Sequence, residues 1–113
     1  MMQMNYRIRF LQSFYDDAEE ITNYITYTLC NPYAARRFVL NMENAIEERS
    51  RNPEIHAVYA CALNDGTPYY RIIVSNFIVL YVILTEDDEN IMEVRRVLYG
   101  RRNIPLLLFD EKV

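Results

Sequence analysis

Residues 69–102 limit the folds open to this chain more than any other stretch. Three runs rich in Val, Ile and Tyr follow one another, separated by short polar breaks at residues 75–76 and 86–90. Runs of this composition and spacing predict a three-stranded antiparallel meander. The middle run, residues 77–84, is apolar on both of its faces. We therefore expect it in the interior of a sheet, with other elements covering at least one side.

The chain before the meander begins with a predicted strand and a predicted helix. Residues 6–10 alternate apolar side chains with arginines, which is typical of a short half-buried strand. Apolar residues at helical spacing then predict a helix over residues 14–29. Ser13 is expected to cap it, and acidic residues crowd its first turns, where the helix dipole favours them.

A second helix is predicted over residues 32–51. Asn31 is a good N-cap residue, and proline is tolerated at the first helical position, where Pro32 stands. Pro53 is expected to end the helix, because proline disfavours helical backbone in the residue before it. With almost no linker between them, the two helices should form an antiparallel hairpin whose apolar faces pack on the sheet.

The predicted fold is therefore α+β, in the order β-α-α-β-β-β, with the helices packed on one side of a curved sheet. A chain of 113 residues is long enough for one core, so we expect a single domain over residues 1–113. Residues 103–113 are expected to form a C-terminal tail. Its apolar run at residues 106–109 either packs on the sheet or is available to a partner chain.

Composition narrows the possible chemistry. The chain has a net charge of −4, which argues against simple polyanion binding, and eleven of its twelve cations are arginine. Arginine suits bidentate contacts with phosphate or carboxylate; the alternative is that each arginine pairs with a nearby acid. No stretch is apolar enough to span a bilayer, and the N-terminus does not resemble a secretory signal. We expect a cytoplasmic chain with two free cysteines and no membrane contact.

Three kinds of active site are excluded. A two-histidine ribonuclease site is impossible because His56 is the single histidine, and a glycine-rich phosphate loop is impossible because only two glycines occur. A metal site is not expected, because no cluster has metal-ligand spacing. An enzyme here would need no metal and no cofactor, and would depend on arginine, tyrosine and glutamate. RNA cleavage by the 2′-hydroxyl fits such residues, since guanidinium groups stabilise phosphoryl charge while an acid and a base move protons. Tyr99 is a candidate acid or base or else a packed aromatic; Glu54 is a candidate base or a solvated carboxylate.

The ordered set of elements and motifs resembles the RelE/ParE superfamily of toxins from type II toxin–antitoxin modules. The residues that carry the resemblance are Asn52-Pro53-Glu54 after the second helix, Tyr70-Arg71-Ile72 at the start of the meander, and Val-Leu-Tyr-Gly-Arg-Arg-Asn-Ile at residues 97–104. The resemblance implies a cognate antitoxin as partner. One branch of the superfamily cuts mRNA on the ribosome, and the other poisons DNA gyrase.

On the nuclease interpretation, the resemblance implies that Arg71, Tyr99, Arg102 and Glu54 are catalytic. Arg95, Arg96 and Arg101 are then expected to bind substrate. The leading hypothesis is a metal-free endoribonuclease that acts on ribosome-bound mRNA, and the first alternative is a gyrase inhibitor similar to ParE. A second alternative is a non-catalytic interaction module. The nuclease interpretation requires guanidinium groups from non-adjacent strands to converge on one exposed patch beside Tyr99.

Overall fold

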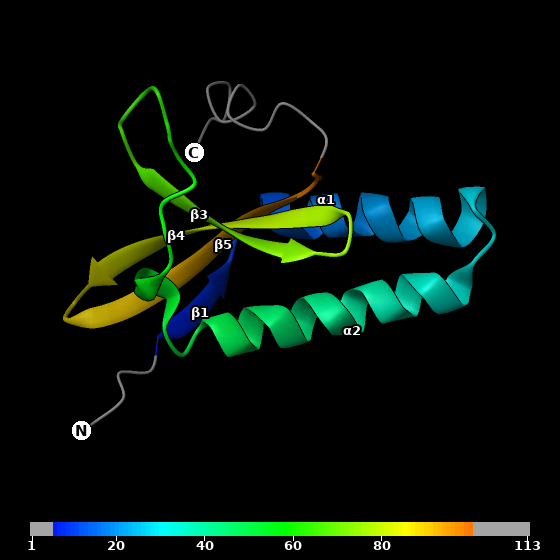
Figure 1. The fold of residues 1–113 in the computed structure, drawn as a ribbon, viewed down its shortest axis with the longest axis horizontal. Helices are drawn as coiled ribbons and strands as arrows, with labels where there is room; N and C mark the ends of the chain where they lie inside the picture. Colours follow the sequence, from blue (N-terminus) through cyan, green and yellow to red (C-terminus); the bar gives the residue numbers. More distant parts are fainter. Residues whose placement is uncertain (1–5, 101–113) are drawn as a thin grey trace.

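The computed structural model of the chain describes residues 6–100 (Figure 1). The strands are β1 (Arg7–Phe10), β2 (Ala60–Cys61), β3 (Pro68–Val74), β4 (Phe77–Glu86) and β5 (Glu89–Tyr99). The helices are α1 (Gln12–Asn23), which continues as the π-helix η1 (Tyr24–Thr28), α2 (Pro32–Arg49) and the short 3-10 helix η2 (Pro53–Ile55). The predicted α+β class and the order of the main elements are confirmed.

The strands described form one five-stranded sheet in the order β1-β5-β4-β3-β2. Strands β3, β4 and β5 are the predicted antiparallel meander. Strand β4 lies at the centre, and four of its successive residues, Val79, Leu80, Tyr81 and Val82, have no exposed surface. The sequence did not predict that β1 pairs with β5 in parallel, nor that β2 adds a short strand beside β3.

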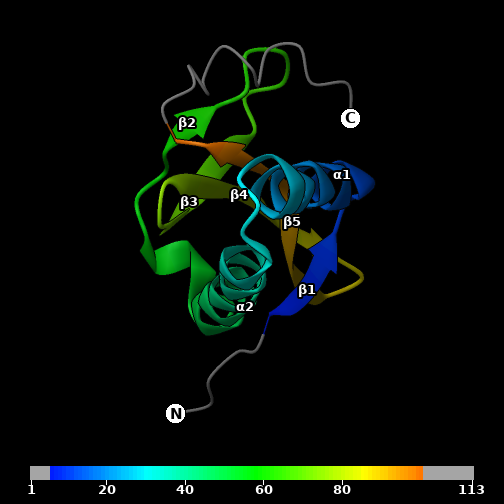
Figure 2. The ribbon, with the colours of Figure 1, turned by 90° about the vertical axis from the view of Figure 1, so that its right-hand side faces the viewer.

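Both helices pack on one face of the sheet. Helix α1 lies over β5 and α2 lies over β3, and Figure 2 shows the two helices end-on. The helix-side core joins four helix residues to buried strand residues: Phe14, Phe38, Met42 and Ile46 with Ile72, Val74, Val79, Tyr81, Met92, Val94 and Val97. The far-side core, on the opposite face, consists of Ala62, Tyr69, Ile78, Leu80, Val82 and Leu98. The predicted placement of the helices on one side of the sheet is confirmed.

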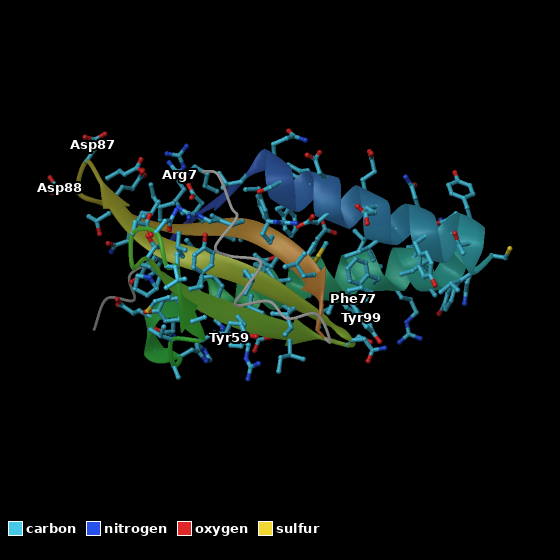
Figure 3. The ribbon with its side chains drawn as sticks, turned by 90° about the horizontal axis from the view of Figure 1, so that it is seen from above. Arg7, Tyr59, Phe77, Asp87, Asp88 and Tyr99 are labelled. Atoms are coloured by element: carbon cyan, nitrogen blue, oxygen red, sulfur yellow. The ribbon has the colours of Figure 1, made fainter. Side chains whose placement is uncertain are left out.

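The turn between β4 and β5 has two residues, because Glu86 pairs with Glu89. Asp87 and Asp88 both have positive φ, at 51° and 63°. Two successive residues in this conformation make a two-residue hairpin turn whose twist matches that of the strands, and aspartate tolerates the left-handed region well. Figure 3 shows the pair at one end of the molecule, and the connection between α1 and α2 lies at the other end.

The two predicted helix caps have different outcomes. The Asn31 side chain accepts a hydrogen bond from the Ala34 N–H at 3.1 Å, so the predicted N-cap of α2 is confirmed. The Ser13 prediction is wrong: α1 begins after Leu11 without a side-chain cap. Ser13 lies inside the helix, and its hydroxyl donates to the Arg95 carbonyl at 2.7 Å. The partner of this serine is a carbonyl at the edge of β5, 82 positions away in the sequence, so the local sequence does not reveal the contact.

Helix α2 ends at Arg49, two residues earlier than predicted, and Pro53 begins η2.

No helix within residues 6–100 combines the length and apolar character needed to cross a bilayer. The predicted tail, residues 103–113, and its apolar run at residues 106–109 lie outside the described residues.

Candidate functional site

Arg71 lies on the face of the sheet away from the helices. Its neighbours in β3, Ile72 and Val74, belong to the helix-side core, whereas Tyr69 belongs to the far-side core. Because side chains alternate along a strand, Arg71 shares the far face with Tyr69. Its guanidinium carbon is 4.6 Å from the ring centroid of Tyr59, which also packs on that face. Arg71 is exposed, and no carboxylate in the described part of the chain pairs with it.

Tyr99 lies on the helix side, at the end of β5. It shares the parity of Val97, a helix-side core residue, and its ring is 5.8 Å from that of Phe77 in an edge-on arrangement. The Phe77 ring is in turn 4.9 Å from Phe38 of α2. Figure 3 shows Tyr99 beside Phe77 near the helices, with Tyr59 elsewhere on the sheet. Tyr99 is 38% exposed.

The structure therefore does not bring together the two central residues of the predicted site. Arg71 and Tyr99 lie on opposite faces of the sheet, so the predicted convergence beside Tyr99 is not found among residues 6–100. The physical reason is that side chains alternate between the two faces along each strand, and the pairing of the strands fixes which residues share a face. Tyr99 pairs with Phe77, while Arg71 pairs with Leu80, and Phe77 and Leu80 belong to opposite faces.

Arg95 is held inside the protein instead of facing a substrate. Its side chain is buried, its Nε donates to Glu93 Oε1 at 2.8 Å, and its Nη1 donates to the Tyr69 hydroxyl at 2.9 Å. Burial alone would lower the pKa of Arg95, but the hydrogen bonds to Tyr69 and Glu93 outweigh it and raise the pKa above its ordinary value. The same carboxylate also accepts from Arg9 Nε at 2.7 Å. The geometry is that of a structural ion-pair network.

Arg96 is likewise engaged with another part of the chain. It forms a two-pronged pair with Asp17 of α1, with Nε to Oδ2 at 2.6 Å and Nη2 to Oδ1 at 3.0 Å. Asp17 lies 79 positions away in the sequence, which is why the sequence did not reveal the pairing. Both Arg95 and Arg96 were expected to bind substrate, and the structure places both in internal ion pairs.

Glu54 stands in η2 and is bound to the start of the chain. It accepts a hydrogen bond from the phenol of Tyr6, and this contact, together with burial as the larger cause, raises the pKa of Tyr6 to about 12. Tyr6 packs against the helix-side core, so Glu54 is also held on the side opposite Arg71. Arg101 and Arg102, the other two predicted site residues, lie outside the described residues.

The closing motif is anchored to the turn between β3 and β4. The Gly100 N–H donates to the Asn76 carbonyl at 2.8 Å, and a Cβ at Gly100 would lie 3.2 Å from that oxygen. Beside this anchor is a groove of about 630 Å³ between the helices and the sheet, lined in part by Glu20, Tyr24, Leu29, Asn76, Phe77 and Tyr99. Tyr99 therefore borders a largely apolar groove, which the sequence pattern did not predict.

The exposed apolar side chains cluster near the same groove. Tyr24, Tyr27, Leu29 and Tyr33 are more than half exposed, and all four lie where α1 and η1 turn into α2. We call these four residues the hairpin tip. Figure 1 shows that this end of the two helices extends beyond the sheet. Exposed aromatic and leucine side chains gathered in one place are typical of a protein-binding surface.

In the described part of the chain, no group of three or more His, Cys, Asp or Glu residues is placed to hold a metal ion.

Comparison with protein families identifies the family of this chain. Residues 8–104 match the ParE toxins of type II toxin–antitoxin systems, known as parDE. The chain belongs to this family. The expected membership of the RelE/ParE superfamily of toxins is confirmed.

Two solved structures resemble this ParE-family chain. A YoeB/ParE toxin from Agrobacterium tumefaciens is 16% identical, with 82% of this chain and 97% of that chain covered and a TM-score of 0.55. The archaeal RelE–RelB complex from Pyrococcus horikoshii OT3 is 15% identical, with coverage of 88% and 99% and a TM-score of 0.49. Among curated proteins, no relative matches. At such low identity, the first structure supports the ParE-like fold and says nothing further about activity.

Proposed function

We propose that this ParE-family toxin poisons DNA gyrase by binding it, and does not cut mRNA. The observation that carries the proposal is the placement of Arg71 and Tyr99 on opposite faces of the sheet. Acid–base cleavage of RNA requires the proton-transfer group and the phosphate-binding group to lie within hydrogen-bond reach of one scissile bond. Arg95 and Arg96, which would have added positive charge to such a site, are held by Glu93 and Asp17.

The hairpin tip and the neighbouring groove supply the surface for such binding. They combine exposed aromatic side chains with an apolar hollow, the pattern found at the centre of protein interfaces. A gyrase poison requires surface complementarity and no reacting group of its own. We further propose that a cognate antitoxin holds the toxin inactive until the antitoxin is lost, as the family assignment implies.

One observation favours the second candidate, ribosome-dependent mRNA cleavage. Arg71 is exposed, stacked on Tyr59, and has no carboxylate partner among residues 6–100. A guanidinium in this state is available to a phosphate. Under this alternative, Arg71 would bind the scissile phosphate, and Glu54, Tyr99 and Arg102 would have to supply the remaining groups.

Two assays with the purified full chain separate the candidates. In the first, gyrase supercoils relaxed plasmid in the presence of increasing toxin; in the second, ribosome-bound mRNA is tested for cuts by primer extension. We expect inhibited supercoiling, DNA cleavage complexes and intact mRNA. Cut mRNA with normal supercoiling would overturn the proposal in favour of the nuclease. Harmless overexpression with neither effect would favour the non-catalytic interaction module.

Arg71→Ala sharpens the distinction. Because Arg71 lies on the opposite face from the hairpin tip and its groove, the variant should keep the wild-type level of gyrase inhibition. A nuclease that used Arg71 for the phosphate would lose at least a hundredfold in cleavage rate, since removing one such charged donor typically costs a few kcal/mol. Arg7→Ala, an exposed arginine of β1 that pairs with Glu89 and lies away from the hairpin tip, serves as the matched control and should leave both activities unchanged.

A further inference from the structure

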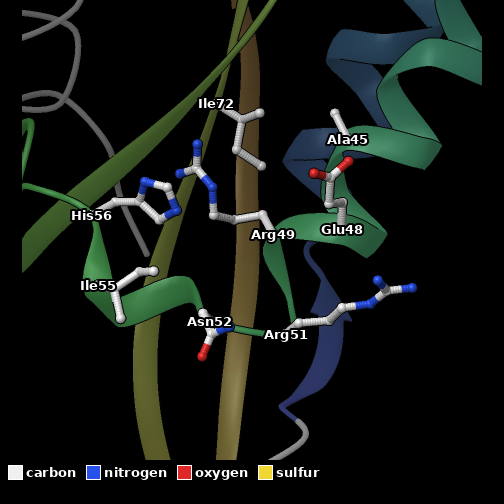
Figure 4. A pocket seen from close by; sticks show the side chains of 8 residues that line it. All are labelled: Ala45, Glu48, Arg49, Arg51, Asn52, Ile55, His56 and Ile72. Atoms are coloured by element: carbon white, nitrogen blue, oxygen red, sulfur yellow. The ribbon is translucent and has the colours of Figure 1, made fainter.

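A second hollow, separate from the groove beside Tyr99, lies at the C-terminal end of α2. It has a volume of about 470 Å³ and is bordered by α2, by η2 and by β3 (Figure 4). Its lining mixes charged, polar and apolar side chains, among them Arg49, Arg51, Asn52, Ile55, His56 and Ile72. We call it the Arg49 pocket. None of the predicted active-site residues that the structure describes lines it.

Arg49 is held in place by fixed acceptors. Its Nη1 donates to the Arg71 carbonyl at 2.9 Å and to the Tyr81 hydroxyl at 3.0 Å. Tyr81 is buried, and its hydroxyl donates to the Pro53 carbonyl at 2.8 Å. The Nε and Nη2 groups of Arg49 have no hydrogen-bond partner in the described structure. An oriented guanidinium with two adjacent nitrogens unused can receive a carboxylate through two parallel hydrogen bonds.

The charge around the pocket supports an anionic occupant. Arg7, Arg9, Arg95 and Arg96 all pair with acids, and these pairs involve β1 and β5. Arg49 and Arg51, in contrast, pair with no carboxylate of the described residues. Desolvation and the positive charge of Arg49 lower the pKa of His56, which disfavours its charged form in the pocket. Figure 4 shows Arg49 reaching toward His56, whereas the side chain of Arg51 extends away from both, so Arg49 is the cation placed to meet an occupant.

We propose that the Arg49 pocket binds a carboxylate side chain from an acidic segment of a protein partner, with an adjacent apolar side chain of that segment against Ile55 and Ile72. Ile55 is 72% exposed, so its contact surface is open. This inference rests on the proposed antitoxin only for the source of the acidic segment.

A nucleic acid fits this pocket less well than an acidic peptide does. Binding a phosphate backbone depends on several cations arranged along a track, and here Glu48 lines the same pocket as Arg49 and Arg51. The chain as a whole carries a net charge of −4. A single carboxylate flanked by apolar side chains matches one fixed guanidinium flanked by isoleucines.

The single histidine of the chain makes a direct test possible. NMR of the full chain shows one imidazole, and His56 lines the pocket. At constant pH, the chain is titrated with the blocked peptide Leu-Glu-Leu-Glu-Leu and, as the matched control, with Leu-Gln-Leu-Gln-Leu. We expect a saturable shift of the His56 resonances with the first peptide and at least tenfold weaker binding of the second.

Two variants locate the effect. Arg49→Gln should weaken binding of the acidic peptide at least tenfold. Because Arg49 also supports Tyr81, Ile55→Glu provides a second test at an exposed position, where the introduced carboxylate should compete for Arg49 and weaken binding similarly. Arg37→Gln, on the same helix but outside the pocket, should bind as the wild type does.

The proposal is overturned if both peptides shift His56 equally, if neither does, or if a single-stranded RNA hexamer shifts it at lower concentration than the acidic peptide. The titration contains neither gyrase nor antitoxin, so its outcome is independent of the supercoiling assay. A toxin that inhibits gyrase but does not bind the acidic peptide would contradict this inference alone. A toxin that binds the peptide but does not inhibit gyrase would contradict only the proposed function.

Discussion

At the scale of single residues, Glu93 is a buried acid that joins an arginine of β1 to an arginine of β5. It is 4% exposed and accepts hydrogen bonds from both Arg9 and Arg95. Removing one partner of a buried ion pair leaves the other charge uncompensated, which is more costly than the pair itself is stabilising. The buried side chain that loses its partner here is Arg95.

We therefore expect Glu93→Ala to lower the free energy of unfolding by about 3 kcal/mol, measured by urea denaturation. Glu89→Ala is the matched control, since Glu89 also pairs with an arginine of β1, Arg7, but on the solvent side. That control should change stability by less than about 1 kcal/mol. Equal losses in the two variants would contradict a structural role for the buried pair.

His56 gives a pH-dependent prediction at the same scale. Desolvation first, and the charge of Arg49 second, lower its pKa below the ordinary value of 6.5. The folded chain thus binds this proton less readily than the unfolded chain does. The resulting contribution to stability is present above about pH 6.5 and is lost as the pH falls through the lower folded pKa.

An NMR titration of the imidazole should therefore give a pKa below 6.5 for the wild type. In Arg49→Gln the pKa should rise, although not fully, because desolvation remains. Arg51 and Glu48 line the same pocket with opposite charges. The single variants Arg51→Gln and Glu48→Gln show whether these two charges also change the pKa of His56. The same pKa in the wild type and in Arg49→Gln would show that Arg49 and His56 are not close in solution.

At the scale of elements, α1 closes an edge of the sheet that would otherwise be open. Strand β1 pairs only with residues 91–94 of β5, and the rest of that edge runs beside α1. Ser13 donates to the Arg95 carbonyl, and Asp17 Oδ2 accepts from the Val97 N–H at 3.2 Å. Helix side chains thus take the place of a neighbouring strand and protect the edge from pairing with other chains.

Asp17→Ala should lower the free energy of unfolding by about 2 kcal/mol, since it removes a charged acceptor from both Val97 and Arg96. Amide hydrogen exchange at Val97 should become faster as well, because its N–H loses its partner. Asp16→Ala should change the free energy of unfolding very little, because the Asp16 carboxylate contacts only the exposed Gln12 one turn before it. Unchanged exchange at Val97 would mean that α1 does not cap this edge.

At the scale of the whole molecule, the two faces of the sheet have different surroundings. The helix side carries Tyr99 and its groove, and the far side carries Arg71 on Tyr59 and the network of Arg9, Glu93 and Arg95. The proposed target-binding surface and an exposed cation are therefore separated by the thickness of the sheet. This separation is why the proposed function relies on the hairpin tip.

Leu29→Asp tests that surface. Leu29 is 54% exposed and lines the groove, so the change should cost little stability while it places a charge where the target would pack. We expect at least tenfold weaker inhibition of gyrase supercoiling, since hot-spot truncation at interfaces commonly has this size. Leu63→Asp, at a 70% exposed position in the loop between β2 and β3, should leave inhibition unchanged. Equal inhibition by both variants would place the target elsewhere.

The sequence by itself determined the order of the main elements, the meander, the central position of β4 and the Asn31 cap of α2. These features depend on composition and spacing over short distances, which the linear pattern records directly. It also determined the superfamily, because the motifs stand in order along the chain. Even the arginine-rich character of β5 was evident from sequence.

Only the tertiary structure decided what each arginine contacts and which face it occupies. The irregularity at Leu80 and Tyr81 changes the pairing of β4 with β5, so strand parity counted along the sequence does not carry across the sheet. The partners of Arg96 and Arg9 lie 79 and 84 positions away, and no local pattern encodes such distances. The Arg49 pocket exists because the end of α2, η2 and β3 meet only after the chain has folded.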